Sequence, residues 1–510
     1  MPPPSQSNVF DPCPSPFNMA AHVLGFSNPD PDKIALSVLS HSGAKRWNYR
    51  DLTALVLKTA QGFLDSGLKS GDKVLIRLGN TVDFPVCYLA ALAVDMVPVP
   101  TSAQLTKGEV DRIVDELSPR GLVQGPDTAK SSREIDVTIT PQDIETYKDK
   151  REAQYVFGDP NRLGYIVYTS GTSGKPRAVM HAHRAIWARQ MMIRDWYDLR
   201  ESDRILHAGA FNWTFTLGTG LMDPWTMGAT ALIADASVQL EALPLLLKRH
   251  DATLFAAAPG VYRRLLKRPE LLTLPKLRHS LSAGEKLSPS IAQNWSNATG
   301  SPIYEAFGMS ECSTFISGAP QRPIEPTALG YAQRGRRVEI LPIQDGTDPV
   351  PPNTEGCIAV HKGDAGLMLG YFRQPIETQS KFRGDWFITG DLGSKDENDV
   401  ITYYGRQDDM MNAGGFRVSP IEVEATLSQH PNIQAVAVKD IEIKEDVSLI
   451  HAFYVADKEI PKTELFAFAS QHLASYKQPK EYRRIERLPT GANSKLSRKE
   501  LVNFLGATLG

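Results

Sequence analysis

Two hydrophobic patterns alternate along most of the chain. Residues 51–57 space their apolar side chains as an amphipathic helix does, whereas residues 73–78 form the short apolar run of a buried strand. Helical and strand patterns return in turn at residues 83–94, 97–100, 204–207, 229–233 and 252–257. Short apolar strands between helices are typical of largely parallel sheets covered by helices. We therefore predict an α/β fold with a large N-terminal domain of packed mixed sheets and flanking helices.

The pattern changes after Arg406. The segment Ser419-Pro-Ile-Glu has the form of a capping box with proline in the first turn, which predicts a helix that His430-Pro431 ends. Further elements are expected as strands at residues 434–439, 449–455 and 482–488 and as a helix at 463–475. These elements predict a small, mobile α+β domain, so we divide the chain into residues 1–407 and 408–510. Residues 1–30, rich in Pro, Ser and Asn, are expected to wrap the surface.

Composition narrows the classes of function. The formal charge of −2 gives no global reason to expect nucleic acid as a partner. The four cysteines are widely spaced, which argues against a disulfide framework or a zinc site and fits a reducing cytosol. The N-terminus lacks the pattern of a signal peptide, and the most apolar stretch, residues 84–94, is shorter than the ~20 residues that span a bilayer. We expect a cytoplasmic enzyme without integral membrane association.

A glycine-rich segment follows an apolar strand at residues 164–177, which read GYIVYTSGTSGKPR. Small residues, hydroxyls and one lysine can turn N–H groups and a cation toward phosphate oxygens. The segment is not a Walker A loop, because Thr169 stands where that motif needs glycine and Pro176 where it needs Ser or Thr. A flexible surface loop is the alternative, but the adjoining buried strand and the lysine favour phosphate binding.

Residues 168–176 resemble the phosphate loop of the acyl-adenylate-forming superfamily, which includes acyl- and aryl-CoA synthetases, adenylation domains of peptide synthetases and beetle luciferases. Five more segments resemble the same family in the same order, at residues 282–287, 304–311, 386–391, 405–417 and 488–495. Together they cover essentially the whole chain. The stretches Ser282-Ala-Gly-Glu and Phe211-Asn-Trp213 look most like those of the acetyl-, medium-chain and benzoate-type ligases.

The resemblance implies roles for single residues. Phe307 would face the adenine, which Gly284 lets approach closely, while Asp391 and Arg406 would reach the ribose. Ser310 would contact the α-phosphate and Glu311 would hold Mg²⁺; with Lys495 they form the implied catalytic set. The implied ATP-binding residues are Thr169, Ser170, Gly171, Thr172, Ser173, Gly174, Lys175, Gly284, Glu285, Lys286, Glu305, Ala306, Phe307, Ser310, Asp391, Arg406 and Lys495.

The C-terminal segments imply a second step. Asp408 would be the hinge, and the implied CoA-binding residues are Gly414, Gly415, Phe416 and Arg417. Lys495 would bridge the substrate carboxylate and the α-phosphate. The residue before this lysine is Ser494, where the family has glycine; if φ is positive there, serine costs about 1–2 kcal/mol.

The implied enzyme is an AMP-forming acid–CoA ligase that uses ATP, Mg²⁺ and coenzyme A. Acetate enzymes of the family carry a tryptophan where this chain has Gly308, so we expect an acid larger than acetate, short- or medium-chain or aromatic. The expected acyl-pocket walls are Phe211, Trp213, Ala283, Phe307, Gly308 and Met309. Two alternatives stay open: a stand-alone enzyme that loads a carrier protein, and a non-catalytic nucleotide sensor. The oligomeric state is open, with a homodimer as one alternative.

Overall fold

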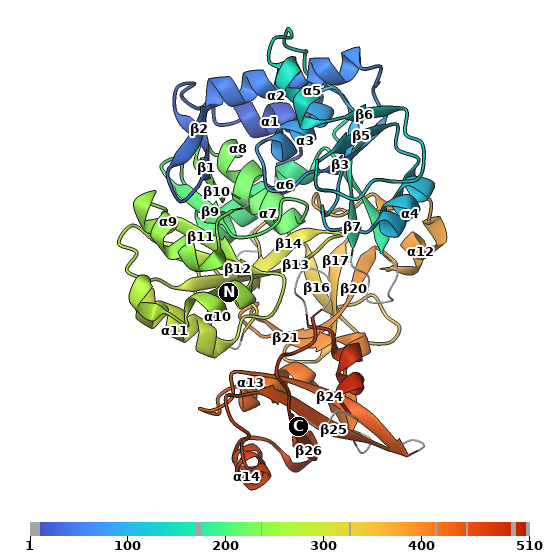
Figure 1. Cartoon of the computed structure of the whole chain (residues 1–510). Helices are drawn as coiled ribbons and strands as arrows, with labels where there is room; N and C mark the ends of the chain where they lie inside the picture. The colour runs from blue at the N-terminus through green and yellow to red at the C-terminus, as the bar shows by residue number, and fades with distance from the viewer. Residues whose placement is uncertain are drawn as a thin grey trace, which may run out of the picture.

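A computed structural model shows a large mixed α/β domain followed by a smaller C-terminal domain, as predicted (Figure 1). No helix within the described part of the chain is both long and apolar enough to cross a membrane. The structure describes residues 11–169, 176–235, 237–325, 328–413, 416–444, 447–490 and 496–505.

A nine-stranded sheet forms the centre of the large domain. Its strands from β13 to β1 run parallel, whereas β14, β15 and β2 are antiparallel to their neighbours. In spatial order the strands are β15 (Tyr331–Ala332), β14 (Ser313–Ser317), β13 (Ile303–Met309), β12 (His279–Ala283), β11 (Leu254–Ala257), β9 (Arg204–His207), β10 (Thr230–Ala234), β1 (Ile34–Leu39) and β2 (Ala44–Asn48).

Successive strand residues point to opposite sides of this sheet, so it has two apolar faces, and helices cover both of them. On one face Phe255 packs against α10 (Pro259–Leu265) and α11 (Pro289–Thr299), with α9 (Leu243–Arg249) in the same cluster. On the other face Leu254 and Ala256 contribute to a core with α6 (Ala185–Met192) and α7 (Thr214–Leu217).

Three smaller sheets complete the large domain. A parallel sheet contains β4 (Val97–Pro100), β3 (Lys73–Arg77), β5 (Gly121–Gln124) and β6 (Val137–Ile139). Its strands β3, β4 and β5 are connected by α3 (Asp83–Ala93) and α4 (Lys107–Leu117), whereas α2 (Tyr49–Asp65) precedes β3 and α5 (Pro141–Tyr147) follows β6. The second sheet consists of β18 (Gly370–Tyr371), β8 (Arg177–Ala182) and β7 (Leu163–Thr169). The third consists of β16 (Val338–Leu341), β17 (Gly356–His361), β20 (Trp386–Lys395), β19 (Phe382–Arg383) and β21 (Ile401–Arg406).

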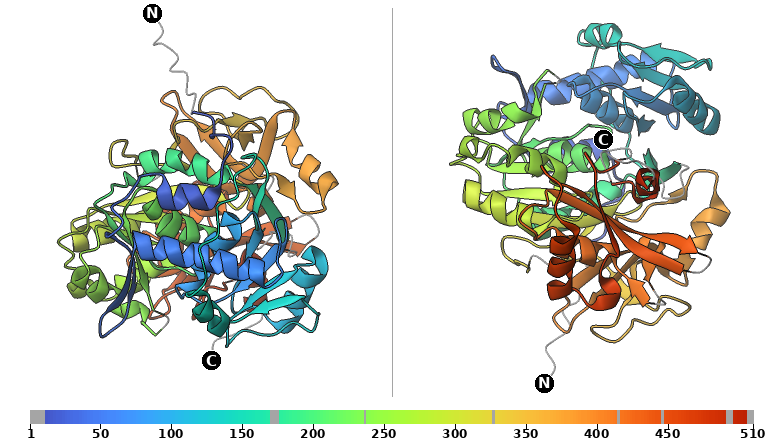
Figure 2. Two further views of the ribbon diagram at one scale, coloured as in Figure 1. Left: turned by 90° about the horizontal axis from the view of Figure 1, so that it is seen from above. Right: turned by 60° about the horizontal axis from the view of Figure 1, so that its bottom comes forward.

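The smaller domain comes toward the viewer in the right view of Figure 2. It has its own core, formed by residues between Met411 and Tyr482. Ser419 caps α13 by accepting from the Glu422 N–H at 3.3 Å, as predicted, but the Glu422 carboxylate pairs with Lys477 instead of closing a capping box. The predicted strand at 482–488 is shorter, at Glu481–Arg484. The elements are β22 (Met411–Ala413), β23 (Phe416–Val418), α13 (Pro420–Leu427), β24 (Ala435–Lys444), β25 (Val447–Val455), α14 (Lys462–His472) and β26 (Glu481–Arg484).

The prediction that residues 1–30 wrap the surface was wrong for residues 17–24. Residues 19–25 form α1, and Phe17, Val23 and Leu24 are buried in a core cluster that also contains α2 and α3. Asn18 accepts from two N–H groups of α1, and its amide donates to the carbonyl oxygens of Leu92, Ala93 and Val156. These bonds satisfy backbone groups that burial would otherwise leave unpaired.

Candidate active site

The turn after β12 lies at the carboxyl edge of the nine-stranded sheet, where parallel α/β sheets commonly bind ligands. Gly284 has a positive φ of 96°, a conformation that favours glycine. A Cβ built there would lie 2.6 Å from the Trp213 ring, so the indole packs directly on the glycine. Ala283 pairs with Ala306 across β12 and β13. The predicted pocket residues Trp213 and Ala283 therefore lie together beside this turn.

Lys286 and Glu305 form an ion pair behind the same turn. The Lys286 ammonium lies 2.7 Å from Glu305 Oε2 and also donates to the Ala328 carbonyl. The other Glu305 oxygen accepts from the Leu287 N–H at 2.8 Å. Both predicted nucleotide residues are thus occupied in bracing the turn, and their contribution to a nucleotide site would be indirect.

Phe307, Asp391 and Arg406 lie together although they come from different strands. The Phe307 ring centroid is 5.2 Å from that of Tyr403, whose hydroxyl donates to Asp391 Oδ1 at 3.1 Å. Arg406 Nη1 donates to Asp391 Oδ2, also at 3.1 Å. One tyrosine therefore joins the aromatic face that was predicted for adenine to the carboxylate that was predicted for ribose.

Asp391 is only 3% exposed, and its burial raises the pKa of its carboxyl, while the Arg406 charge acts in the opposite direction. Each oxygen of a carboxylate accepts more than one hydrogen bond, so the carboxylate can still accept two hydroxyl groups. This geometry suits a vicinal diol.

The turn after β13 carries Ser310 and Glu311. The Ser310 carbonyl lies 2.7 Å from His181 Nε2, and Glu311 Oε1 accepts from the Tyr371 hydroxyl at 2.8 Å. Burial lowers the pKa of His181 to about 4, so the ring is neutral near pH 7 and this contact is a hydrogen bond with Nε2 as donor. Glu311 is 7% exposed.

Glu311 fits the metal that the family implies. Mg²⁺ commonly takes one or two protein carboxylates and completes its shell with phosphate oxygens and water. Within the described part of the chain Glu311 Oε2 accepts no hydrogen bond, so this oxygen is available to a cation. No group of three His, Cys, Asp or Glu in that part could hold a metal without such additional ligands.

The glycine-rich segment begins and ends on paired strands. β7 ends at Thr169 and β8 begins at Arg177, whose N–H donates to Thr169 Oγ1 at 3.3 Å. The predicted phosphate residues Ser170, Gly171, Thr172, Ser173, Gly174 and Lys175 lie outside the described residues.

The other predicted pocket walls pack in different hydrophobic clusters. Phe211 is 1% exposed and packs edge-on against Phe84 in the core around α1 to α3. Met309 and Phe307 belong to a different cluster, which contains Phe315. Gly308 lies at an irregularity of the β13–β14 pairing, where a Cβ would meet the Ser313 carbonyl oxygen at 2.3 Å. Close backbone approach is therefore a sufficient reason for glycine at this position.

The hinge and the C-terminal site residues are only partly described. Asp408 is exposed in a short 3₁₀ turn, Gln407–Asp409, between β21 and β22. The backbones of Phe416 and Arg417 lie in β23. Gly414, Gly415, Ser494 and Lys495 lie outside the described residues.

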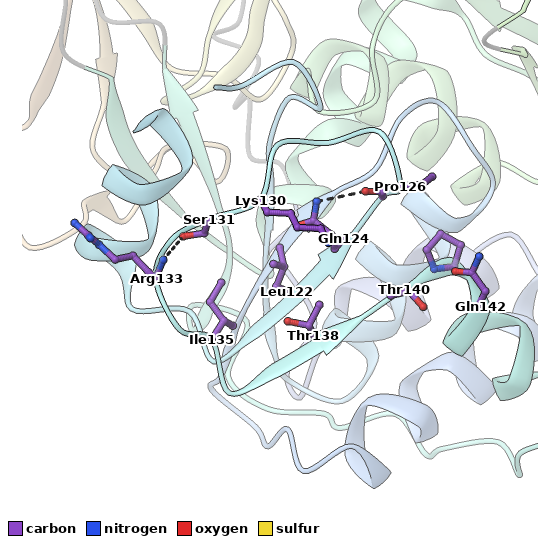
Figure 3. Close-up of a pocket in the computed structure, with 12 residues that line it drawn as sticks. Leu122, Gln124, Pro126, Lys130, Ser131, Arg133, Ile135, Thr138, Thr140 and Gln142 are labelled. Carbon is purple, nitrogen blue, oxygen red and sulfur yellow. Dashed lines mark hydrogen bonds between the residues drawn. The ribbon is translucent and has the colours of Figure 1, made fainter. Parts of the chain in front are cut away.

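A separate cavity of about 340 Å³ is lined by residues of β5 and β6, of the segment between these strands and of the start of α5 (Figure 3). None of the predicted site residues lines it. Its polar side chains are largely engaged elsewhere, because Ser131 donates to Asp111 and Arg133 pairs with Asp115. We assign no function to this cavity.

Sequence reasoning missed Tyr403, Tyr371 and His181. Simple strand alternation would place Tyr403 and Arg406 on opposite faces of β21. The pairing of β20 with β21 skips Tyr404, and this bulge brings both side chains to Asp391. The two tyrosines of the segment Tyr403-Tyr-Gly-Arg are evident in the sequence, but nothing in this segment indicates the bulge.

The fold of this chain is shared with solved structures of known proteins. The solved structure of a benzoate CoA ligase from Burkholderia xenovorans LB400 has a TM-score of 0.85 at 24% identity and covers 95% of this chain and 99% of its own. The family model described as AMP-binding enzyme matches residues 26–372, and the model described as AMP-binding enzyme C-terminal domain matches residues 422–495. The chain belongs to the AMP-binding enzyme family.

Two relatives that are named as ligases align with this chain over nearly their whole lengths. An uncharacterised acyl–CoA ligase of Bacillus subtilis is 27% identical over 96% of both chains. A 3-hydroxybenzoate–CoA/4-hydroxybenzoate–CoA ligase of Thauera aromatica is 27% identical over 90% of this chain and 92% of its own.

Proposed function

We propose that this enzyme is an AMP-forming acid–CoA ligase that activates a carboxylic acid with ATP and transfers the acyl group to coenzyme A. The observation that carries the proposal is the cluster of Phe307, Tyr403, Asp391 and Arg406, which offers an aromatic face for a purine and a carboxylate for the ribose diol. The relatives that carry ligase names support the same activity.

In the proposed first half-reaction, a carboxylate oxygen of the acid attacks the α-phosphorus of ATP. The bond between this phosphorus and the bridging oxygen breaks, and pyrophosphate leaves. Both reactants are anions, so catalysis consists mainly of positioning and charge neutralisation. Lys495 would bridge the carboxylate and the α-phosphate, Ser310 would contact that phosphate, and residues 169–175 would cradle the others. Mg²⁺ held by Glu311 would neutralise phosphate charge.

In the second half-reaction, the thiol of coenzyme A loses its proton to solvent and attacks the acyl carbon, and AMP leaves with the mixed-anhydride oxygen. We propose that residues 408–510 rotate about Asp408 between the two steps. The rotation would withdraw Lys495, bring Gly414, Gly415 and Phe416 to the thiol path, and turn Arg417 toward phosphate. Such alternation lets a single site run two reactions.

The acid would lie beside Trp213, Ala283 and Gly284 at the carboxyl edge of the sheet. The indole on Gly284 supports this placement because it supplies an apolar wall next to the proposed adenine turn. We propose an acid larger than acetate, either aromatic or a short- or medium-chain acid. The hydroxybenzoate relative supports the aromatic alternative.

We also propose a cytoplasmic location, which the free thiols of all four cysteines support. A homodimer is the oligomeric state that we propose to test first, by light scattering.

The test is pyrophosphate release by purified protein with ATP, Mg²⁺ and a panel of aliphatic and aromatic acids, followed by detection of AMP and acyl-CoA after coenzyme A is added. Lys495→Ala should abolish adenylate synthesis but still convert a supplied acyl-adenylate to the thioester. Lys458→Ala, which removes an exposed lysine of the same domain, is the matched control. Pyrophosphate release that no acid stimulates would refute the proposal.

A further inference from the structure

The three-stranded sheet of β7, β8 and β18 holds the turn that carries Ser310 and Glu311. His181 of β8 binds the Ser310 carbonyl at 2.7 Å. The Met368 N–H, just before β18, donates to the Glu311 carbonyl at 2.7 Å, and Tyr371 of β18 donates to the Glu311 carboxylate at 2.8 Å. Two consecutive residues of the proposed site are therefore bonded to one neighbouring sheet through both backbone and side chain.

The same sheet carries both ends of the glycine-rich segment. Tyr371 pairs with Val179 on β8, which begins at Arg177 immediately after that segment. The Arg177 guanidinium lies 5.3 Å from the centroid of the Tyr371 ring and pairs with Glu377 at 2.7 Å. A cation over an aromatic face restrains the ring. Tyr371 thus contacts the beginning of β8 through its ring and Glu311 through its hydroxyl.

The hydroxyl of Tyr371 constrains how the Glu311 carboxylate can turn. Tyr371 is 2% exposed, so the surrounding protein atoms restrict the movement of its ring and its hydroxyl. Because Oε1 accepts from the Tyr371 hydroxyl, rotation of the carboxylate is restrained, and Oε2 is the oxygen without a hydrogen-bond partner among the described residues. A ligand held in one orientation binds a metal more tightly than one that must first be ordered.

We propose that Tyr371 is a positioning residue: its hydroxyl orients Glu311 so that Oε2 faces the Mg²⁺ that accompanies ATP, and it ties this metal ligand to the sheet that carries the phosphate loop. This inference rests on the proposed function, since Glu311 is a metal ligand only there. A purely structural role for Tyr371 makes a different prediction, because it would weaken nucleotide binding equally with and without metal.

The test is calorimetric titration of the full chain with ATP, once with EDTA and once with excess Mg²⁺. Tyr371→Phe should weaken binding of Mg–ATP about tenfold, the effect of losing one hydrogen bond to a charged group, and should leave metal-free ATP binding unchanged. Tyr49→Phe is the matched control: Tyr49 is also 2% exposed, and its hydroxyl donates to the Ala229 carbonyl at 2.7 Å, a bond to a neutral group in the core. This control should match the wild type in both titrations.

A second measurement isolates the contact. In a Glu311→Gln background, Tyr371→Phe should change Mg–ATP affinity less than twofold, because the oriented carboxylate is already absent. Equal weakening with and without Mg²⁺, or wild-type affinity for Mg–ATP in Tyr371→Phe, would overturn the inference alone. A wild-type chain that binds no Mg–ATP would instead refute the proposed function.

Discussion

Gly308→Ala tests whether this glycine opens the acyl pocket or makes room for a neighbouring strand. From the sequence alone, Gly308→Trp is expected to shift preference toward acetate or propionate by restoring a plug. In the structure a Cβ at 308 would lie 2.3 Å from the Ser313 carbonyl oxygen and 2.5 Å from Thr314 Cα. Both are backbone atoms of β14, so the β13–β14 hairpin must shift to admit any side chain.

The hairpin has little freedom to shift. Ser313 already has a φ of 62°, and its hydroxyl accepts from Arg189 at 2.7 Å. Arg189 is itself held by Asp223 in a buried ion pair. Overpacking of this kind typically costs about 1–3 kcal/mol, and we expect this loss of unfolding free energy for Gly308→Ala. The turn at Ser310 and Glu311 would move with the hairpin, so KM for ATP should rise while the relative kcat/KM values for different acids stay unchanged.

The assay is urea unfolding followed by tryptophan fluorescence, combined with kinetics for a short, a medium-chain and an aromatic acid. All seven tryptophans lie between Trp47 and Trp386, so the signal reports the large domain. Gly260→Ala is the control, because a Cβ in this α10 position meets nothing within 4 Å and alanine favours a helix by up to about 1 kcal/mol. Full stability of Gly308→Ala together with a changed acid preference would refute the reasoning and support the plug.

Two further predictions concern charge. Arg406→Met should lower the unfolding free energy by up to about 3 kcal/mol and raise KM for ATP, because the Asp391 carboxylate stays buried without its cation. The double variant Arg406→Met/Asp391→Asn should recover the stability measured by urea unfolding but not the affinity for ATP. Recovery of both would contradict a ribose site at Asp391 and Arg406. Burial lowers the pKa of His181 to about 4, below the usual 6.5, so the unfolded chain binds more protons there and stability should fall as the pH drops from 6.5 toward 4. His181→Gln should reduce this slope by about 1 kcal/mol per pH unit in urea unfolding at pH 7 and pH 5, and an unchanged slope would exclude the neutral ring.

The alternation of helices and apolar strands predicted the large domain well, because the spacing of apolar residues within each segment indicates whether it forms a helix or a strand. Residues 204–207 form β9, and residues 83–94 form α3 within one residue. The N-terminal helix was missed although Asn18 caps it locally, because the burial of this segment depends on contacts with distant residues, including the bonds from the Asn18 amide to the carbonyl oxygens of Leu92, Ala93 and Val156. A local pattern of Pro, Ser and Asn carries no information on such contacts.

The candidate site was predictable as a set of segments but not as a set of contacts. Asp391 and Arg406 were both expected at the ribose, and the structure places them 3.1 Å apart. Tyr403 and Tyr371 could not be assigned, because the first depends on a bulge in β21 and the second on the pairing of β18 with β8. The pairing of strands that are distant in the chain is decided by tertiary packing.

The site depends on single side chains that bridge separate sheets. Tyr403 joins Phe307 of the nine-stranded sheet to Asp391 of β20, and Tyr371 joins Glu311 to the sheet of the glycine-rich segment. Each bridge includes a single hydrogen bond to a carboxylate, with a net value of about 1–3 kcal/mol, which is small beside the apolar cores that hold the sheets themselves. Removing one hydroxyl therefore leaves the fold intact but frees one part of the site relative to another. Since catalysis by positioning loses about a hundredfold in rate for a displacement of 1 Å, these tyrosines should matter more to the reaction than to stability.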